Sequence, residues 1–522
     1  MTLIRAALSP LVALGVMLAS CAPPAPSVGS GPTVAAAPTT DTRASVVRLA
    51  WEDVGVPTPF RISTNGPGGA VMLTLLYDTL TWKDERGLIP WLASRWDVSA
   101  DGREYSFTLS PGVTWQDGQA LTAADVAFSF AYYASHPYRW TSTDVVESAT
   151  AVGADQVRIR LRQPFAPFLE NIAGAVPIVP EHIWARVDKP ETYDGPDASI
   201  GSGPFRLAEY RPADGAYRLT ANPTYFRGPV AASEFQQLNI PPETRVQALQ
   251  RGEIDLAWST DASVLDLFKG HPRDKVLETP PLSIVRLAVN TEQPPLDRPE
   301  VRQALLYALD RATLGQTITR AAPIVASAGI IPPESPWFAP GLQDYPFDPG
   351  RARGLLGGLT ASLELLALPT YREPELLAPM LQAVGITLVT RRVDDATRAQ
   401  LVRERRFQLV ELQHIGVGGD PDFLRRWSAG QETNDAAQGF VWRDASFAQL
   451  AAAQAATLDP TQRKAIVFDM QHLLADQVPT IPLYVRRFYW LYDSTRYTPM
   501  NTWGGLMNGI PLAQNKLTFL RR

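Results

Sequence analysis

The chain has a single cysteine among its 522 residues, Cys21, and this limits what can hold the fold together. No disulfide can form within the chain, and no thiolate metal site or cysteine nucleophile can be built beyond position 21. Stability must come from the packing of an apolar core, which is feasible because 45% of the residues are hydrophobic and 19% are charged. At roughly 100 to 200 residues per domain, the length predicts two or three domains.

The cysteine closes a short export pattern at the N-terminus. Arg5 gives a positive start, residues 6–20 are an almost unbroken run of apolar and small residues, and Leu18-Ala19-Ser20-Cys21 matches a lipobox. The run is shorter than the ~20 apolar residues of a membrane-spanning helix. We therefore expect residues 1–21 to be a lipoprotein signal peptide with a lipid attached to Cys21, and the mature protein to be extracytoplasmic and lipid-anchored. A cleaved secretory peptide with an unmodified cysteine is the alternative.

The next segment, residues 22–44, carries five prolines among Ala, Ser, Thr and Gly, so we expect a flexible tether. Strand and helix patterns alternate beyond it. Alternating apolar residues predict strands at 46–51, 104–109, 157–161 and 254–258. Capping residues and helical spacing predict helices that begin at Thr122, Glu243, Pro299 and Asp459, the last of them burying Ile466, Met470, Leu473 and Leu474. This alternation favours an α/β architecture of several lobes.

Several sequence blocks resemble those of the extracytoplasmic solute-binding proteins of family 5, the lipoproteins of peptide/nickel-class ABC importers. In chain order they are LYDTL at 76–80, PWLA at 90–93 with Trp96, DGREYSFTLSPGVTWQDGQALTAADVAFSF at 101–130, GSGPF at 201–205, ALQRGEIDLAW at 248–258 and LAVNTEQPPLDRPEVRQALLYALDR at 287–311. The resemblance extends over most of the chain beyond the tether. The blocks at 101–130 and 287–311 are the most specific.

The resemblance implies an α/β, two-lobed periplasmic-binding-protein fold of type II, the large cluster C-like form, with an extra inserted subdomain in the first lobe. The implied pieces are a lobe I base at 45–75, 196–286 and 490–522, an inserted subdomain at 76–195, and lobe II at 287–489. Hinges are expected at 285–290 and 484–489. Closure favours binding only if the ligand contacts both lobes.

The stretch HIGVGGDPDFLRRW at 414–427 corresponds to a motif in which peptide-binding relatives fix the ligand's ammonium group. Those relatives carry an aspartate four residues before the proline, and that place is Val417 here. A valine cannot neutralise an ammonium group. Either Asp420 or Asp422 replaces the missing carboxylate, or the solute has no free peptide amino terminus. Both aspartates could instead cap the helix expected at 423–427.

Other ligand-binding candidates are aromatic or polar residues that the resemblance places near the lobe junction. They are Trp51, Gly203, Trp258, Asn290, His414, Trp427 and Trp503. Aromatic faces suit peptide side chains, sugar rings and flat organic molecules alike. The alternative for each aromatic residue is ordinary burial in the core.

The implied function is the capture of a peptide or peptide-like solute by a monomer, and its delivery to an ABC permease and ATPase. The same fold binding an oligosaccharide, a metal chelate or another non-peptide solute is the first alternative. A binding protein that signals instead of feeding a transporter also stays open.

An extracellular hydrolase is the rival class. The five histidines are scattered, without HExxH, and no Gly-x-Ser-x-Gly elbow occurs, so we expect no catalytic residues and no enzyme activity. A metal site on His414 and Asp420 would have only two ligands, so no metal or cofactor is expected. The formal net charge of −5, without a long basic run, predicts no nucleic-acid partner.

Overall fold

The computed structural model describes residues 45–62, 68–84, 87–138, 140–281, 283–321, 324–417, 419–428, 439–499 and 515–520. All of them belong to one compact unit, Thr42–Arg522. The expected signal peptide, Cys21, the tether and Trp503 lie outside the described residues. Within the described ranges, the structure has no helix with the length and apolar character needed to cross a membrane.

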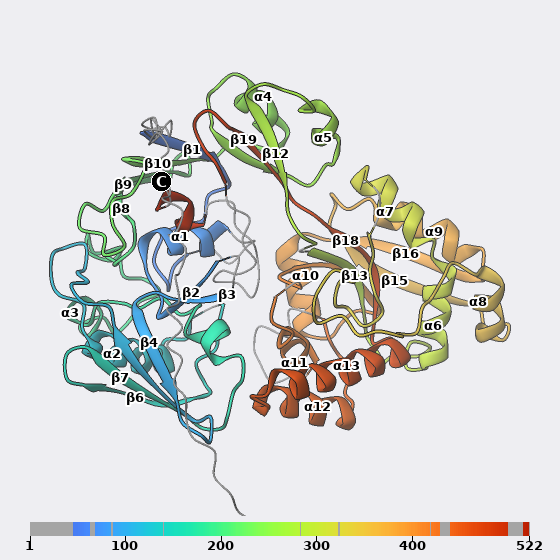
Figure 1. Cartoon of the computed structure of the whole chain (residues 1–522). Coiled ribbons are helices and arrows are strands. Elements are labelled where there is room, and N and C mark those ends of the chain that lie inside the picture. The colour runs from blue at the N-terminus through green and yellow to red at the C-terminus, as the bar shows by residue number, and fades with distance from the viewer. Residues whose placement is uncertain are drawn as a thin grey trace, which may run out of the picture. The chain divides into compact units, whose positions relative to one another are not determined.

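A seven-stranded sheet organises the first lobe (Figure 1). Its order is β12 (Asp274–Glu278), β19 (Tyr489–Asp493), β11 (Leu256–Ser259), β1 (Val46–Ala50), β10 (Glu234–Leu238), β9 (Ala216–Ala221) and β8 (Phe205–Arg211). The central strand β1 runs parallel to both β10 and β11, whereas the outer pairs are antiparallel. We call this sheet, with the elements inserted between β1 and β8, lobe I.

The insertion contains a four-stranded antiparallel sheet and a hairpin. The sheet order is β4 (Ala93–Val98), β5 (Glu104–Leu109), β7 (Gln156–Leu161) and β6 (Val146–Val152), and the hairpin is β2 (Thr81–Asp84) with β3 (Gly87–Pro90). The expected strand at 104–109 is confirmed, because Tyr105, Phe107 and Leu109 are buried on one face. We call these elements the inserted subdomain.

A six-stranded sheet organises the second lobe, which we call lobe II. Its order is β14 (Ile324–Val325), β18 (Thr480–Arg486), β13 (Ser283–Val289), β17 (Leu409–Ile415), β15 (Ala361–Ala367) and β16 (Ile386–Arg392). Strand β15 is parallel to both β16 and β17, and β13 is antiparallel to its two neighbours.

Helices cover these sheets (Figure 1). In lobe I they are α1 (Gly68–Leu76), α2 (Ala123–Ser135), α3 (Glu181–Trp184), α4 (Arg245–Gln250) and α5 (Ser263–Leu267), with the helical turns η1 (Phe168–Ile172) and η2 (Pro242–Thr244), and η4 (Lys516–Phe519) near the C-terminus. In lobe II they are α6 (Pro299–Ala308), α7 (Arg311–Thr319), α8 (Pro349–Leu356), α9 (Glu373–Gln382), α10 (Asp395–Arg403), α11 (Phe423–Ser428), α12 (Ala445–Ala456) and α13 (Pro460–Gln477).

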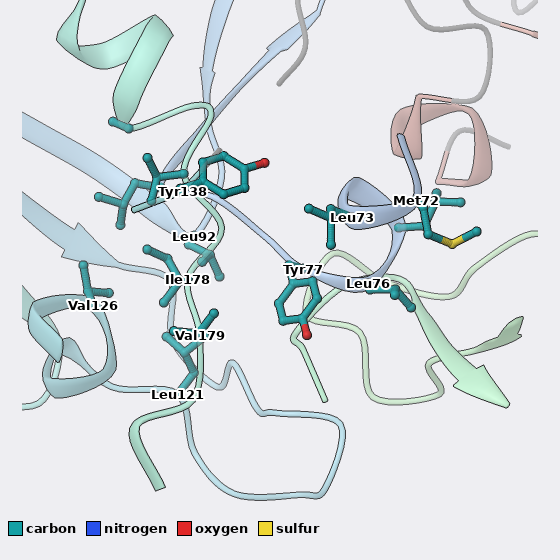
Figure 2. Close-up of a cluster of buried hydrophobic side chains, with 14 of the residues drawn as sticks. Met72, Leu73, Leu76, Tyr77, Leu92, Leu121, Val126, Tyr138, Ile178 and Val179 are labelled. Atoms are coloured by element: carbon teal, nitrogen blue, oxygen red, sulfur yellow. The ribbon is translucent and has the colours of Figure 1, made fainter. Parts of the chain in front are cut away.

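One continuous hydrophobic cluster joins α1 to the inserted subdomain. Leu73 and Leu76 lie in α1 and Tyr77 directly follows it, whereas Leu92 and Ile178 come from two separate segments of the insertion. Figure 2 shows these five side chains as members of one buried cluster. These side chains are at most 1% exposed, and full burial of a leucine or isoleucine contributes roughly 1.5–3 kcal/mol. The inserted subdomain therefore shares one hydrophobic core with the rest of lobe I.

The chain crosses between the two large sheets twice, from β12 to β13 and from β18 to β19 (Figure 1). The crossings are bonded to each other: the N–H of Thr279 donates to the carbonyl of Phe488 at 2.9 Å, and the N–H of Phe488 donates to Thr279 Oγ1 at 2.9 Å. The hinge expected at 285–290 is wrong, because β13 occupies most of that range and every residue of β13 is buried. The segment expected at 484–489 does contain a crossing, at Arg487 and Phe488.

The implied domain boundaries stay a prediction. The strands of the seven-stranded sheet come from 46–50, 205–278 and 489–493, and those of the six-stranded sheet begin already at Ser283.

Helix starts follow the expected capping chemistry. At α2 the N–H of Thr122 donates to Asp125 Oδ2 at 2.8 Å, and at α13 Asp459 accepts from the N–H of Gln462 at 2.8 Å. The expected helix from 243 to 251 is a 3-10 turn, η2, followed by α4.

The buried face of α13 differs from the expected one. Ile466 and Leu473 are only half-buried, whereas Arg463 and Gln471 point into the protein. Gln471 Nε2 donates to the carbonyl of Trp337 at 2.7 Å, and Arg463 binds Asp420. Apolar spacing does not reveal a helix face that is buried through hydrogen bonds.

Candidate functional site

Each large sheet contains three neighbouring parallel strands, β10-β1-β11 in lobe I and β16-β15-β17 in lobe II. In open α/β sheets, ligands bind outside the carboxyl ends of such strands. Trp51 directly follows β1, Trp258 lies near the end of β11, His414 lies near the end of β17, and Val417 follows β17. The fold therefore places four of the expected site residues at carboxyl ends.

In lobe I, the tryptophans form an aromatic cluster. The ring centroid of Trp51 lies 5.6 Å from that of Trp258 and 5.7 Å from that of Trp490, and Trp258 lies 5.5 Å from Phe488 at the crossing. Trp51 and Trp490 are buried, whereas Trp258 is half-buried. Trp258 is thus the member of the cluster with a surface left for a ligand.

Arg245 completes this cluster from the first turn of α4. Its guanidinium carbon lies 5.1 Å from the Trp258 ring centroid, Nη2 donates to Glu52 Oε1 at 2.8 Å, and Nε donates to the carbonyl of Ile240 at 2.9 Å. Arg245 Nη1 and Trp258 Nε1 are buried and have no acceptor among the described residues. Because buried donors are nearly always paired, these two call for an acceptor from water or a ligand.

In lobe II, His414 lies between an arginine and a tryptophan. Its Nε2 is 2.9 Å from Arg286 Nη2, and its ring centroid is 4.4 Å from that of Trp427. A guanidinium group can only donate, so His414 accepts through Nε2 and is neutral with its proton on Nδ1. Burial first, and then the positive charges of Arg286 and Arg398, hold the pKa of His414 well below its usual value.

The two aspartates of the motif are both ion-paired. Asp420 accepts from Nη1 and Nη2 of Arg463, both at 2.7 Å. Asp422 accepts from Arg425 at 2.7 and 2.8 Å and from Gln454 at 2.7 Å. Burial would raise the pKa of Asp422, but the bonds and charge of Arg425 outweigh burial and lower it. Neither carboxylate is left over for a ligand's ammonium group in this conformation.

Capping does not explain the two aspartates either. Asp420 Oδ1 accepts from the N–H of Asp422 at 2.9 Å, but neither side chain bonds an N–H of α11 in the part of this helix that the structure describes. Val417 is 1% exposed and packs in the hydrophobic cluster with Phe423 and Trp427.

Gly203 and Asn290 have structural contacts. The N–H of Gly203 donates to the carbonyl of Leu76 at 2.9 Å, and a Cβ at this position would come within 2.5 Å of the carbonyl oxygen of Leu75. Asn290 Nδ2 donates to the carbonyls of Arg405 and Phe407, each at 3.0 Å. Both residues therefore position backbone segments.

Sequence reasoning missed a buried acid cluster in lobe II. Glu411 in β17 is fully buried, and burial, followed by the negative charge of Glu373, raises the pKa of Glu411 to about 9. Glu373 also accepts from the hydroxyl of Tyr484 and from Arg486 at 3.2 Å. The one available signal was a single glutamate inside the apolar run LVEL at 409–412.

Titratable side chains do not gather into a metal site in the described ranges, where no three His, Cys, Asp or Glu residues come together as ligands. The site instead combines aromatic faces with N–H donors. Such a combination binds flat or extended organic solutes that carry hydrogen-bond acceptors.

Comparison with known proteins gives a family match. Residues 87–435 match the model of the bacterial extracellular solute-binding proteins, family 5 (middle region). The chain is 30% identical over 434 residues to the "Di/tripeptide-binding protein 4" of Pseudomonas aeruginosa (strain UCBPP-PA14), covering 76% of this chain and 81% of that protein.

Solved structures agree with this match. NikA from Brucella suis in complex with Fe(III)-EDTA has a TM-score of 0.78 and 25% identity, covering 89% of this chain and 98% of its own. DppA from Helicobacter pylori in complex with the peptide STSA has a TM-score of 0.76 and 20% identity, covering 91% and 99%. The α/β, two-lobed periplasmic-binding-protein fold implied by the resemblance is confirmed.

Proposed function

Since the chain belongs to the bacterial extracellular solute-binding proteins of family 5, we propose that it captures a peptide or peptide-like solute between its lobes and delivers it to an ABC importer. The observation that carries this proposal is the family match over residues 87–435, together with a relative named for di- and tripeptide binding. Binding and release require no bond of the solute to change, so we assign no catalytic role to any residue.

We further propose that lobe I holds an acceptor group of the solute. Arg245 Nη1 and Trp258 Nε1 supply two neighbouring donors, and the half-buried Trp258 supplies an aromatic face. A peptide carbonyl or a carboxylate fits such a pair of donors. His414 and Trp427 are the matching candidates in lobe II.

The solute's amino group is the point on which this chain departs from the peptide-binding pattern. Val417 offers no charge, and Asp420 and Asp422 are already paired with arginines. We therefore propose that recognition does not depend on a free ammonium group. A metal chelate rich in carboxylates is the second candidate, favoured by the same donors and by the likeness to NikA with Fe(III)-EDTA.

Thermal unfolding with a panel of di- and tripeptides tests both proposals. A ligand at 100 times its Kd stabilises the folded state by about 2.7 kcal/mol, which raises Tm measurably. We expect a peptide that binds to bind about equally well when N-acetylated. If only peptides with a free amino group bind, the proposal that recognition does not depend on an ammonium group is contradicted. A response to Fe(III)-EDTA but to no peptide would favour the second candidate.

Removing the indole of Trp258 should weaken binding of any such ligand. Truncation of a central aromatic anchor costs about 2 kcal/mol or more, so we expect Trp258→Ala to raise Kd roughly 30-fold. Trp96→Ala is the matched control, because Trp96 is also half-buried but lies on β4 of the inserted subdomain. Isothermal titration of both variants with the same ligand measures the effect. Equal losses in the two variants would argue against a site at Trp258.

Membrane attachment is proposed to depend on the lipid at Cys21. We expect Cys21→Ser to move the protein from the membrane fraction to the soluble fraction without changing its Tm. The physical reason is that the lipid would supply the affinity for the bilayer. Fractionation followed by immunoblotting measures this. A variant that stays with the membranes would rule out the lipid as the anchor.

A further inference from the structure

A loop of the inserted subdomain lies against the helices of lobe II. The N–H of Ala166 donates to the carbonyl of Ala455 at 2.6 Å. Ala455 is the second-last residue of α12, and the last four carbonyls of a helix have no partner within the helix. The inserted subdomain thus supplies a donor that α12 cannot provide for itself.

Two side-chain contacts accompany this bond. Asn171 Nδ2 lies 3.5 Å from Asp420 Oδ1, and the guanidinium carbon of Arg425 lies 5.5 Å from the ring centroid of Phe165. Asn171, Asp420 and Phe165 are all buried. The two surfaces are therefore packed against each other at these side chains.

The lobe II side of the contact is a preformed network. Arg463 donates to both oxygens of Asp420 at 2.7 Å and to Gln454 Oε1 at 3.0 and 3.1 Å. Gln454 Nε2 in turn donates to Asp422 Oδ1 at 2.7 Å. These bonds lie wholly within lobe II, so they can hold the carboxylate of Asp420 in place without the segment 165–171.

The two surfaces also interact electrostatically, through Glu170 on one side and Asp420 on the other. Burial raises the pKa of Glu170, Lys83 opposes this shift, and the negative charge of Asp420 raises the pKa further. Glu170 forms an ion pair with Lys83 on its own side. Each surface therefore carries an acid that its own lobe has already paired with a base, and Asn171 meets Asp420 as a neutral donor.

We propose that the segment 165–171 and the Asp420 network form a closing contact, which the two lobes make when they come together and lose when they open. The three contacts join residues of the chain to one another, so they favour the closed form whichever solute is bound. Asp420 and Asp422, in the motif where relatives bind the ligand's ammonium, then act in closure. This inference rests on the proposed function only in that closure serves solute capture.

The test uses Asn171→Asp in the full-length protein without any solute. The new carboxylate would face Asp420 in a buried contact, and like charges there disfavour the closed form. Hydrogen exchange of the Ala166 N–H reports closure directly. Couplings within proteins typically change an equilibrium constant roughly 5- to 150-fold. We expect the Ala166 N–H to exchange about tenfold faster in the variant than in the wild type.

Two further variants keep the test falsifiable. Gln163→Glu makes the same amide-to-acid change at an exposed position of the same loop and should leave the exchange unchanged. Adding Asp420→Asn to Asn171→Asp exchanges the two groups across the contact, removes the like-charge pair, and should restore slow exchange.

The possible outcomes separate this proposal from the function. Equal exchange in Asn171→Asp and Gln163→Glu would overturn the closing contact, as would a defect of Asn171→Asp that the double variant does not repair. Because no solute is present, a failure to find a peptide ligand would count against the proposed function and leave the closing contact standing.

Discussion

Replacing Lys516 by methionine is expected to destabilise the protein by about 3–5 kcal/mol, because it removes one partner of a fully buried ion pair. Lys516 Nζ donates to Asp78 Oδ1 at 2.7 Å, and both side chains are 0% exposed. The ammonium group also lies 4.2 Å from the ring centroid of Trp82 and 4.9 Å from that of Trp91. Burial lowers the pKa of Lys516, and Asp78 opposes that shift.

The loss of stability in Lys516→Met arises because the buried carboxylate of Asp78 would remain without a positive partner. Asp78 also accepts from Trp91 Nε1 at 2.6 Å, from the Tyr225 hydroxyl at 3.0 Å and from the Ser202 hydroxyl at 3.0 Å. These neutral donors stabilise the negative charge but do not cancel it. Methionine matches the length and shape of the lysine stem, so the lost charge dominates over any cavity.

Urea unfolding followed by tryptophan fluorescence measures the effect as a shift of the midpoint. Lys269→Met is the matched control, because Lys269 is exposed, and exposed substitutions usually change stability by less than about 0.5 kcal/mol. Adding Asp78→Asn to Lys516→Met removes both charges and should recover most of the loss. A Lys516→Met midpoint equal to that of Lys269→Met would contradict the prediction.

This pair also shows what the sequence could not reveal. Lys516 and Asp78 are 438 positions apart, and Lys516 lies in no pattern that distinguishes it from an exposed residue. Local periodicity, by contrast, predicted β5 and the start of α2, because both depend on neighbouring residues. The hinge at 285–290 was misplaced because β13 is buried along its whole length, and its sequence carries no mark of where the chain leaves the sheet.

The candidate site was predictable only in part, for the same reason. The motif at 414–427 identified His414, Val417 and the two aspartates at the end of β17. It did not identify Arg463, which lies 43 positions beyond Asp420 and neutralises it. Whether an acid is free to bind a ligand depends on such distant partners, so the role of Asp420 could be read only from the folded chain.

The buried acid Glu411 should make stability depend on pH. Its pKa is about 9 in the folded protein, against 4.5 for an ordinary glutamate, because of burial and then Glu373. Between these two values the folded state holds a proton that the unfolded state has released. The unfolded state therefore binds fewer protons, and the free energy of unfolding must fall as pH rises from about 4.5 to 9. At ~1.4 kcal/mol per pKa unit, the loss over this window is several kcal/mol.

Glu411→Gln should abolish this loss, because glutamine stays neutral at every pH. We expect the variant to be about as stable as the wild type at pH 5 and more stable at pH 9, with the difference growing steadily between them. Urea midpoints at pH 5, 7 and 9 measure it. Glu300→Gln, at an exposed position of α6, is the control and should follow the wild type throughout. A difference between Glu411→Gln and wild type that stays constant or shrinks as pH rises would mean that Glu411 is already ionised in the folded protein, and that Arg398 and Arg486 outweigh its burial.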